Sequence, residues 1–146
     1  MKLALDLDGA LGDTRPLWDA WVADAGARLG LAGLPADRAA AAALLDGSAG
    51  NWRTLLERFA EDHAPAYLRR DAATSAALQS LASGGLELGV FTDAPEQLAC
   101  VALAQLGAAR RISRLECGAG ALERILAVLG PDAAVVRTRN DLLQRP

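Results

Sequence analysis

The segment that most constrains this chain is an apolar strand that leads two carboxylates into a glycine-containing turn. Residues 3–14 read LALDLDGALGDT, and the aliphatic residues around the acids are typical of a strand buried on both faces. Gly9 permits a sharp turn directly after Asp6 and Asp8. Because ligands bind beyond the carboxyl ends of the strands in an open α/β sheet, we expect a functional site at this turn.

Carboxylates in such a turn admit several roles. Asp6 and Asp8 point to opposite sides of an extended strand, but the turn at Gly9 can bring both to the same edge. There each could act as a covalent nucleophile, a metal ligand or a general acid. The alternative is a buried strand whose acids only accept hydrogen bonds from the amides of the turn.

Length, composition and charge narrow the class of protein. A chain of 146 residues with 52% hydrophobic and 23% charged residues can bury one sizeable core. The formal net charge of −3 shows no excess of basic residues of the kind that binds nucleic acid. The apolar runs are too short to span a bilayer, and the acids within residues 1–20 disfavour a signal peptide, so we expect a cytoplasmic protein without membrane contact. Cys100 and Cys117 are predicted to be free thiols.

Helical and strand patterns alternate along the chain after a long helical opening. Residues 13–75 carry helical patterns without a strand signal, and a further helix is expected to begin near Pro65. Beyond them, strands are predicted over residues 86–91, 111–115 and 133–136, and helices over residues 95–106 and 120–129. This alternation predicts a parallel sheet. We therefore predict an α/β core from residues 1–12 and 76–146, interrupted by a helical domain over residues 13–75.

The pattern Asp-x-Asp-Gly-x-Leu-x-Asp-Thr after an apolar strand resembles the first motif of the haloacid dehalogenase (HAD) superfamily. In that family the first Asp attacks phosphorus, the second acts as acid and base, and Mg²⁺ bridges the nucleophile and the phosphate. The resemblance gives these roles to Asp6 and Asp8 and makes both candidate Mg²⁺ ligands. Dehalogenating members lack the second Asp, so the phosphatase branch is favoured, although Ala10 stands where the family usually has Thr. The implied fold is a HAD-like Rossmannoid parallel sheet with an inserted helical cap of the C1 type.

A second family motif places Ser or Thr at the end of an apolar strand, where it holds phosphoryl oxygens. Residues 89–93 read GVFTD and match this motif, so the resemblance makes Thr92 and its neighbour Asp93 candidate phosphate-binding residues. Hydroxyl and amide donors aimed at developing charge stabilise such transition states. The same Thr-Asp-x-Pro sequence is also typical of a helix N-cap, which is the alternative.

Two later motifs of the family are altered in this chain. Glu116 lies where the family places a lysine, and the only lysine of the chain is Lys2. In the last motif, Gly-Asp-x-x-x-Asp, Arg137 replaces the first acid, a usual metal ligand, and Asp141 matches the second. The remaining candidate Mg²⁺ ligands are therefore Asp141, and Glu116 if it reaches the metal position beside Asp6.

The exchange of a lysine and an aspartate for Glu116 and Arg137 preserves the formal charge but changes the chemistry. A guanidinium has no lone pair to offer Mg²⁺, so ordinary metal binding is disfavoured. We expect Glu116 and Arg137 to form an ion pair across the mouth of the sheet. Arg137 would then either clamp a phosphate bidentately or complete a structural salt bridge in a site that no longer holds metal.

Two classes of function remain open. The first is hydrolysis of a small phosphorylated metabolite through an aspartyl-phosphate on Asp6, weakened by the altered motifs. The second is a catalytically inactive HAD-fold protein that binds a phosphate ligand or a protein partner. Gly118 and Gly120 precede a predicted helix and could hold an anion, but the segment lacks the remaining features of a dinucleotide fingerprint.

Overall fold

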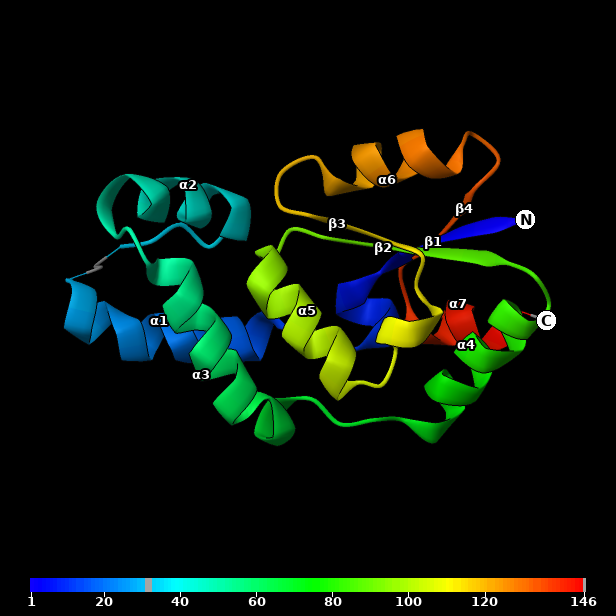
Figure 1. Cartoon of the computed structure of the whole chain (residues 1–146), viewed down its shortest axis with the longest axis horizontal. Coiled ribbons are helices and arrows are strands. Elements are labelled where there is room, and N and C mark those ends of the chain that lie inside the picture. The colour runs from blue at the N-terminus through cyan, green and yellow to red at the C-terminus, as the bar shows by residue number, and fades with distance from the viewer. Residues whose placement is uncertain (31–32, 146) are drawn as a thin grey trace.

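The computed structural model describes residues 1–30 and 33–145, which form a four-stranded parallel sheet of order β3-β2-β1-β4 (Figure 1). Its strands are β1 (Lys2–Asp6), β2 (Glu87–Thr92), β3 (Arg114–Cys117) and β4 (Ala134–Val136). The predicted parallel α/β fold is confirmed. The third strand begins at Arg114 instead of residue 111, because the short helical turn η2 (Ala109–Arg111) precedes it.

Strand β1 is buried on both faces, as its sequence predicts. Leu3 and Leu5 belong to the larger apolar cluster, whereas Ala4 joins a smaller cluster with α6 (Ala121–Leu129). On the neighbouring strand β2, Gly89 allows α6 to approach closely, since a Cβ there would lie 2.9 Å from side-chain atoms of Ile125 and Leu129. Helix α6 is thus held close to the strands whose carboxyl ends carry the candidate site.

Helices cover both faces of the sheet (Figure 1). Helix α6 packs on β1, β2 and β3, and the other face carries α4 (Ala72–Ser83), α5 (Glu96–Gln105) and α7 (Arg139–Gln144). Helix α7 was not predicted from the sequence; it packs on α4 and on the turn that follows β1. Within residues 1–30 and 33–145, no helix combines the length and the apolar character needed to cross a bilayer.

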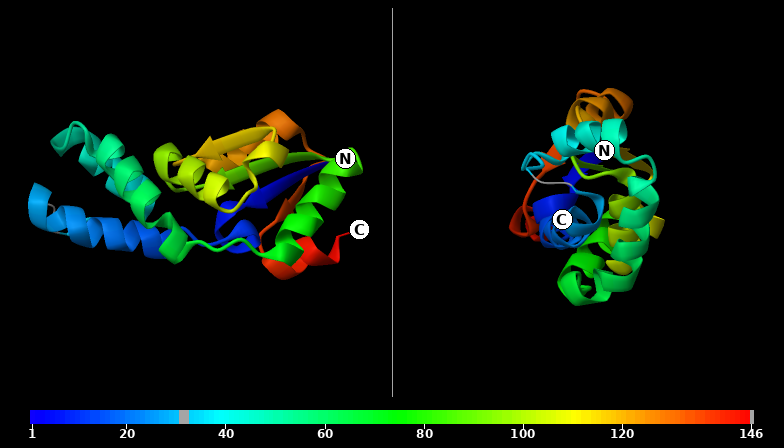
Figure 2. Two further views of the ribbon diagram at one scale, coloured as in Figure 1. Left: turned by 60° about the horizontal axis from the view of Figure 1, so that its bottom comes forward. Right: turned by 90° about the vertical axis from the view of Figure 1, so that its left-hand side faces the viewer.

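The insertion between β1 and α4 includes, in its described residues, the helices α1 (Arg15–Leu29), α2 (Arg38–Ser48) and α3 (Trp52–Tyr67). These helices project beyond one end of the sheet, opposite the two termini (Figure 2). Trp18, Trp21 and Trp52 pack at their centre, with ring centroids 5.3 and 5.9 Å apart. The prediction of a helix start near Pro65 is wrong, because Pro65 lies inside α3 and α4 begins only at Ala72.

The insertion is packed against the core and not merely tethered to it. Helix α3 lies along α5, and one continuous apolar cluster extends across both helices. Leu56 and Ala60 of α3 are fully buried in this cluster together with Leu98 and Ala102 of α5. This packing holds the inserted helices close to the carboxyl edge of the sheet.

Candidate active site

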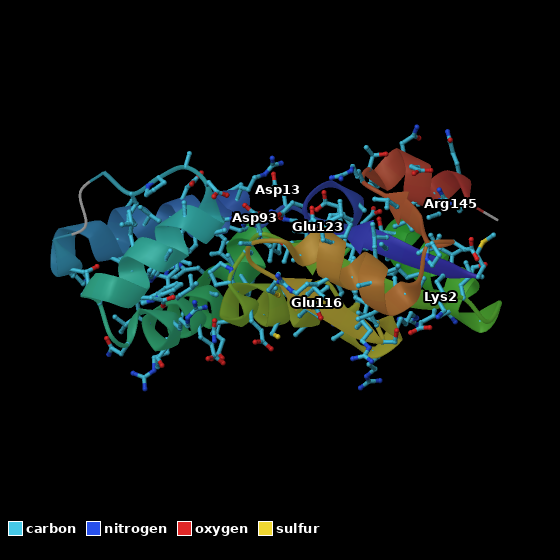
Figure 3. The ribbon with its side chains drawn as sticks, turned by 90° about the horizontal axis from the view of Figure 1, so that it is seen from above. Lys2, Asp13, Asp93, Glu116, Glu123 and Arg145 are labelled. Atoms are coloured by element: carbon cyan, nitrogen blue, oxygen red, sulfur yellow. The ribbon has the colours of Figure 1, made fainter. Side chains whose placement is uncertain are left out.

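A cavity of about 380 Å³ opens at the carboxyl ends of β1 and β2. Its charged and polar lining comes from the sheet, the start of α2, the start of α6 and the residue after β4, and includes Asp6, Asp37, Thr92, Asp93, Glu123 and Arg137. A second cavity of about 420 Å³ adjoins it, and the two linings share Ala39, Asp93, Gly118 and Ala119. Figure 3 shows Asp93 and Glu123 near the middle of the molecule, whereas Lys2 and Arg145 lie toward the end that holds the termini.

The turn η1 (Leu7–Leu11) positions both acids of the first motif. It closes with a hydrogen bond from the Gly9 amide to the Gly12 carbonyl at 2.7 Å, and Gly9 has a φ of +116° that favours glycine. A Cβ at Gly9 would lie only 2.4 Å from the carbonyl oxygen of Arg137. A glycine is therefore required where the turn rests on the chain that follows β4.

Asp6 ends β1 and faces the guanidinium of Arg137. The parallel register pairs Leu5 with Val136, so the next residues along the two strands are neighbours, and Nη1 of Arg137 lies 3.6 Å from Oδ2 of Asp6. The Arg137 side chain is 58% exposed and also lies over the ring of Phe91, 5.6 Å from its centroid. Burial, and next the charge of Asp8, raise the pKa of Asp6 to about 6.

Asp8 has both carboxylate oxygens occupied by donors from the protein. The Thr14 amide and hydroxyl donate to Oδ1 at 2.7 Å each. Oδ2 accepts from the Thr92 hydroxyl at 3.3 Å and from Nη2 of Arg38. Asp8 is thus held in place by three segments of the chain that lie far apart in the sequence.

Arg38 is a site residue that the sequence reasoning missed. It begins α2 in the insertion, yet only 3% of its side chain is exposed, because it reaches into the site. Besides Asp8, it donates to Oδ1 of Asp93 at 2.7 Å and to the Thr14 hydroxyl at 2.6 Å. Burial opposes its charge, but the hydrogen bond to Asp93 and the charge of Asp8 outweigh burial and raise the pKa of Arg38. Its position before five alanines gave no signal of this role.

Thr92 and Asp93 lie where the second motif predicts, at the carboxyl end of β2, but both are engaged within the protein. The Thr92 hydroxyl donates to Asp8 and accepts from the Ala94 amide at 3.2 Å; Thr92 is not the helix N-cap of the alternative interpretation, because Pro95 is the N-cap of α5. Asp93 pairs with Arg38, which leaves its carboxylate next to a cation. The Thr92 hydroxyl therefore has no proton left to donate to a phosphate, and the Asp93 carboxylate is already paired with a cation.

The predicted ion pair between Glu116 and Arg137 is not formed. Glu116 lies on β3 and Arg137 follows β4, which are the two outer strands of the sheet. Three strand spacings of about 4.8 Å separate them by roughly 14 Å. Glu116 instead accepts from Nε of Arg124 at 2.9 Å, and Arg124 also donates to the carbonyls of Cys117 and Ala119. The ion pair between Glu116 and Arg124 therefore holds the loop between β3 and α6 in place.

The residues expected to bind Mg²⁺ do not fit that ion. Glu116 lies two strand spacings, roughly 10 Å, from Asp6, and the Asp141 carboxylate on α7 lies 3.5 Å from Nε of Arg145, the residue after that helix. Asp6 faces one guanidinium, and Asp8 is occupied by another. In the described part of the chain, no group of three His, Cys, Asp or Glu residues could hold a metal ion.

The start of α6 adds anion-binding character to the cavity. Gly118 and Gly120 have φ values of +84° and +71°, and this loop leads the backbone into the first turn of the helix. Ala121 and Leu122 line the cavity there, and of their amides that of Ala121 already donates to the Gly118 carbonyl at 3.3 Å. Amides of a first helical turn lack carbonyl partners within the helix and carry partial positive charge, so they favour an anion.

Comparison with known proteins supports the fold. No known protein family and no curated protein matches the sequence. Among solved structures, the crystal structure of a putative beta-phosphoglucomutase from Thermotoga maritima is similar, with a TM-score of 0.56 and 18% sequence identity over 92% of this chain and 74% of that chain. At this identity the likeness shows the fold alone, which is HAD-like: a parallel α/β sheet with a helical insertion after the first strand.

Proposed function

We propose that the 380 Å³ cavity binds the phosphate group of a small phosphomonoester, with Arg137 as its principal cation and without a resident metal. The observation that carries this proposal is the presence of an exposed guanidinium and a helix N-terminus in one cavity at the carboxyl edge of the sheet. The adjoining cavity of about 420 Å³ is large enough to receive the rest of a small metabolite.

Arg137 has the chemistry needed for this role. Its planar guanidinium can donate two parallel hydrogen bonds to a phosphate, which an ammonium cannot do in the same fixed geometry. At 3.6 Å from Asp6 it forms an open ion pair without a direct hydrogen bond, so its donors can turn to a ligand. The Leu122 amide, in the first turn of α6, would bind one of the remaining phosphate oxygens.

Phosphate-ester hydrolysis is the second candidate, and the position of Asp6 favours it. With a pKa of about 6, Asp6 is mostly ionised at neutral pH and lines the same cavity as Arg137. A carboxylate oxygen of Asp6 could attack phosphorus, expel the alcohol and leave an aspartyl-phosphate for water to hydrolyse. Asp8 would have to leave Arg38 and take up a proton before it could protonate the departing oxygen, which makes binding the better supported function.

The binding proposal is tested by titrating inorganic phosphate and phenyl phosphate into the protein by calorimetry in the presence of EDTA. Arg137→Ala should weaken binding at least tenfold, equivalent to about 1.4 kcal/mol. Arg114→Ala is the matched control, because Arg114 is also exposed but lies outside the cavity. Equal affinities for the wild type and Arg137→Ala would overturn the proposal.

Hydrolysis is tested separately with an aryl phosphate, with and without Mg²⁺. Turnover that Asp6→Asn abolishes would establish the second candidate and identify the nucleophile. Binding without turnover above the Asp6→Asn background would leave the protein as a phosphate-ester-binding member of this fold. A requirement for Mg²⁺ would contradict the metal-free site.

A further inference from the structure

We propose that a cavity at the opposite end of α5 binds a polyanion with two or more linked phosphate groups. This cavity has a volume of about 650 Å³ and is lined by Arg70, Arg110 and Arg111, together with Ala104, Gly107 and Ala109. Among the residues that the structure describes, its lining includes three guanidinium groups and no carboxylate. We call it the arginine cavity.

The arginine cavity is separate from the candidate active site. Glu96, the first residue of α5, lines the cavity next to the active site, whereas Gln105 at the other end of the helix contacts Arg70. Ten residues of α-helix span about 15 Å. The linings of the two cavities at the sheet edge share no residue with the arginine cavity.

Arg70 is held in place by the end of α5. Its Nε donates to the Gln105 carbonyl at 3.3 Å, where the helix C-terminus favours a positive charge. Gly107 has a φ of +72°, and a Cβ at this position would lie 3.0 Å from Cζ and Nε of Arg70. Glycine therefore leaves room for the guanidinium against the backbone, while the Nη groups, unpartnered among the described residues, can bind a ligand.

Arg110 and Arg111 add two charges from the turn η2, which the hydrogen bond from the Arg111 amide to the Ala108 carbonyl closes at 3.1 Å. Among the described residues, no carboxylate lies within 4 Å of either guanidinium or of that of Arg70. The arginines that do form ion pairs in the same part of the chain are Arg15, Arg28, Arg38, Arg53, Arg124, Arg137, Arg139 and Arg145. In a chain with a net charge of −3, three uncompensated positive charges around one cavity favour an anion.

The neighbouring acid does not neutralise this charge. Asp71 follows Arg70 in the chain, but its carboxylate lies 2.7 Å from Nη2 of Arg139 and also accepts from Thr74. Guanidinium groups match phosphate oxygens bidentately, and three of them suit a ligand with several phosphates. The remaining walls are alanine and glycine, without an aromatic ring to stack on a base. We therefore expect recognition of the polyphosphate group itself.

Inorganic pyrophosphate is the probe that tests this proposal. The titrations use the Arg137→Ala protein, so that the candidate active site contributes as little as possible. We expect binding that weakens at least tenfold when Arg110→Ala and Arg111→Ala are added. The paired substitutions Arg110→Lys and Arg111→Lys should weaken pyrophosphate binding less than the paired alanine substitutions do. Lysine keeps the positive charge and loses only the bidentate geometry. Arg114→Ala is the matched control, an exposed arginine outside the cavity, and should leave affinity unchanged.

Thermal melting of each variant shows whether it remains folded, which is expected because Arg110 and Arg114 are exposed. Equal pyrophosphate affinity with and without the paired alanine substitutions would overturn the proposal. So would binding that disappears with Arg137→Ala alone, since the ligand would then occupy only the candidate active site. Absence of pyrophosphate binding to the wild type would overturn it as well. This outcome does not depend on whether the candidate active site binds a phosphomonoester.

Discussion

Two acids of one turn, Asp6 and Asp8, each face an arginine, but the two pairs have opposite environments. The Arg38 and Asp8 side chains are 3% and 10% exposed, and Arg38 comes from the insertion. The Arg137 and Asp6 side chains are 58% and 21% exposed, and both come from the edge of the sheet. The first pair joins the insertion to the core, whereas the second leaves a cation available to a ligand.

The difference shows that burial, and not residue type, sets the role of each ion pair. Removing one partner of a buried pair leaves a charge in a poorly solvated place and typically costs about 3–5 kcal/mol. An exposed pair contributes about 0–1 kcal/mol because water and salt screen it. The two pairs can therefore be separated by experiment, although their acids are only two residues apart in the sequence.

The largest effect is expected from Arg38→Met, which removes the buried cation while keeping a side chain of similar length. Asp8 loses its charged partner, and we expect the free energy of unfolding to fall by about 3–5 kcal/mol. Urea unfolding at pH 7 measures this loss. Arg137→Met is the matched control, with an expected change below about 1 kcal/mol. Similar losses for both variants would show that the two pairs do not differ as their burial implies.

The next prediction concerns the open pair and its effect on metal binding. Arg137→Asp places a second carboxylate beside Asp6 and supplies the oxygen ligands that divalent cations prefer. We expect Mn²⁺ to bind this variant at least tenfold more tightly than the wild type, as measured by calorimetry. Arg114→Asp makes the same change of charge at an exposed residue outside the cavity and should not produce the gain. An equal gain in both variants would attribute the effect to overall charge.

The sequence predicted the parts of the site that local patterns determine. Apolar runs and glycine turns placed Asp6, Asp8 and Thr92 at the carboxyl ends of strands, because the strand periodicity and the turn chemistry lie within a few residues of each acid. The pattern also predicted the parallel sheet. It did not specify the order of the strands, so Glu116 was wrongly paired with Arg137 across the width of the sheet.

Arg38 could not be found in this way. Its partners Asp8 and Asp93 lie 30 and 55 residues away in the sequence, and the contact exists only because tertiary packing brings the start of α2 to the carboxyl edge of the sheet. A single arginine before a run of alanines has the same local pattern as an exposed helix start. Residues that join an insertion to a core depend on tertiary packing, which the sequence pattern of either part does not contain.

A smaller effect is expected from Asp6→Asn, and it should depend on pH. Folding raises the pKa of Asp6 from 3.8 to about 6, so the folded protein binds the proton more tightly and stability falls as pH rises through this window. Two pKa units correspond to roughly 3 kcal/mol, which partial exposure of the carboxyl reduces to about 1 kcal/mol. Between pH 4 and pH 8, the free energy of unfolding of Asp6→Asn should therefore rise by about 1 kcal/mol relative to that of the wild type.

Thermal unfolding of both proteins across this pH range measures the change. A constant difference between Asp6→Asn and the wild type would contradict a raised pKa. A gain that grows toward low pH would show that the Arg137 charge outweighs burial at Asp6 and lowers its pKa instead.

The smallest effect is expected at the third ion pair, Glu116 with Arg124, whose side chains are 25% and 45% exposed. A double-mutant cycle with Glu116→Gln and Arg124→Met should give a coupling of about 0.2–1 kcal/mol in urea unfolding. The same cycle with Glu116→Gln and Arg137→Met should give no coupling, because the two outer strands separate these residues. A measurable coupling to Arg137 would mean that Glu116 reaches across the mouth of the sheet. Arg137 would then be shared between two acids and would be less available to a phosphate, so the exposed pair would no longer differ from the buried pair in offering a cation to a ligand.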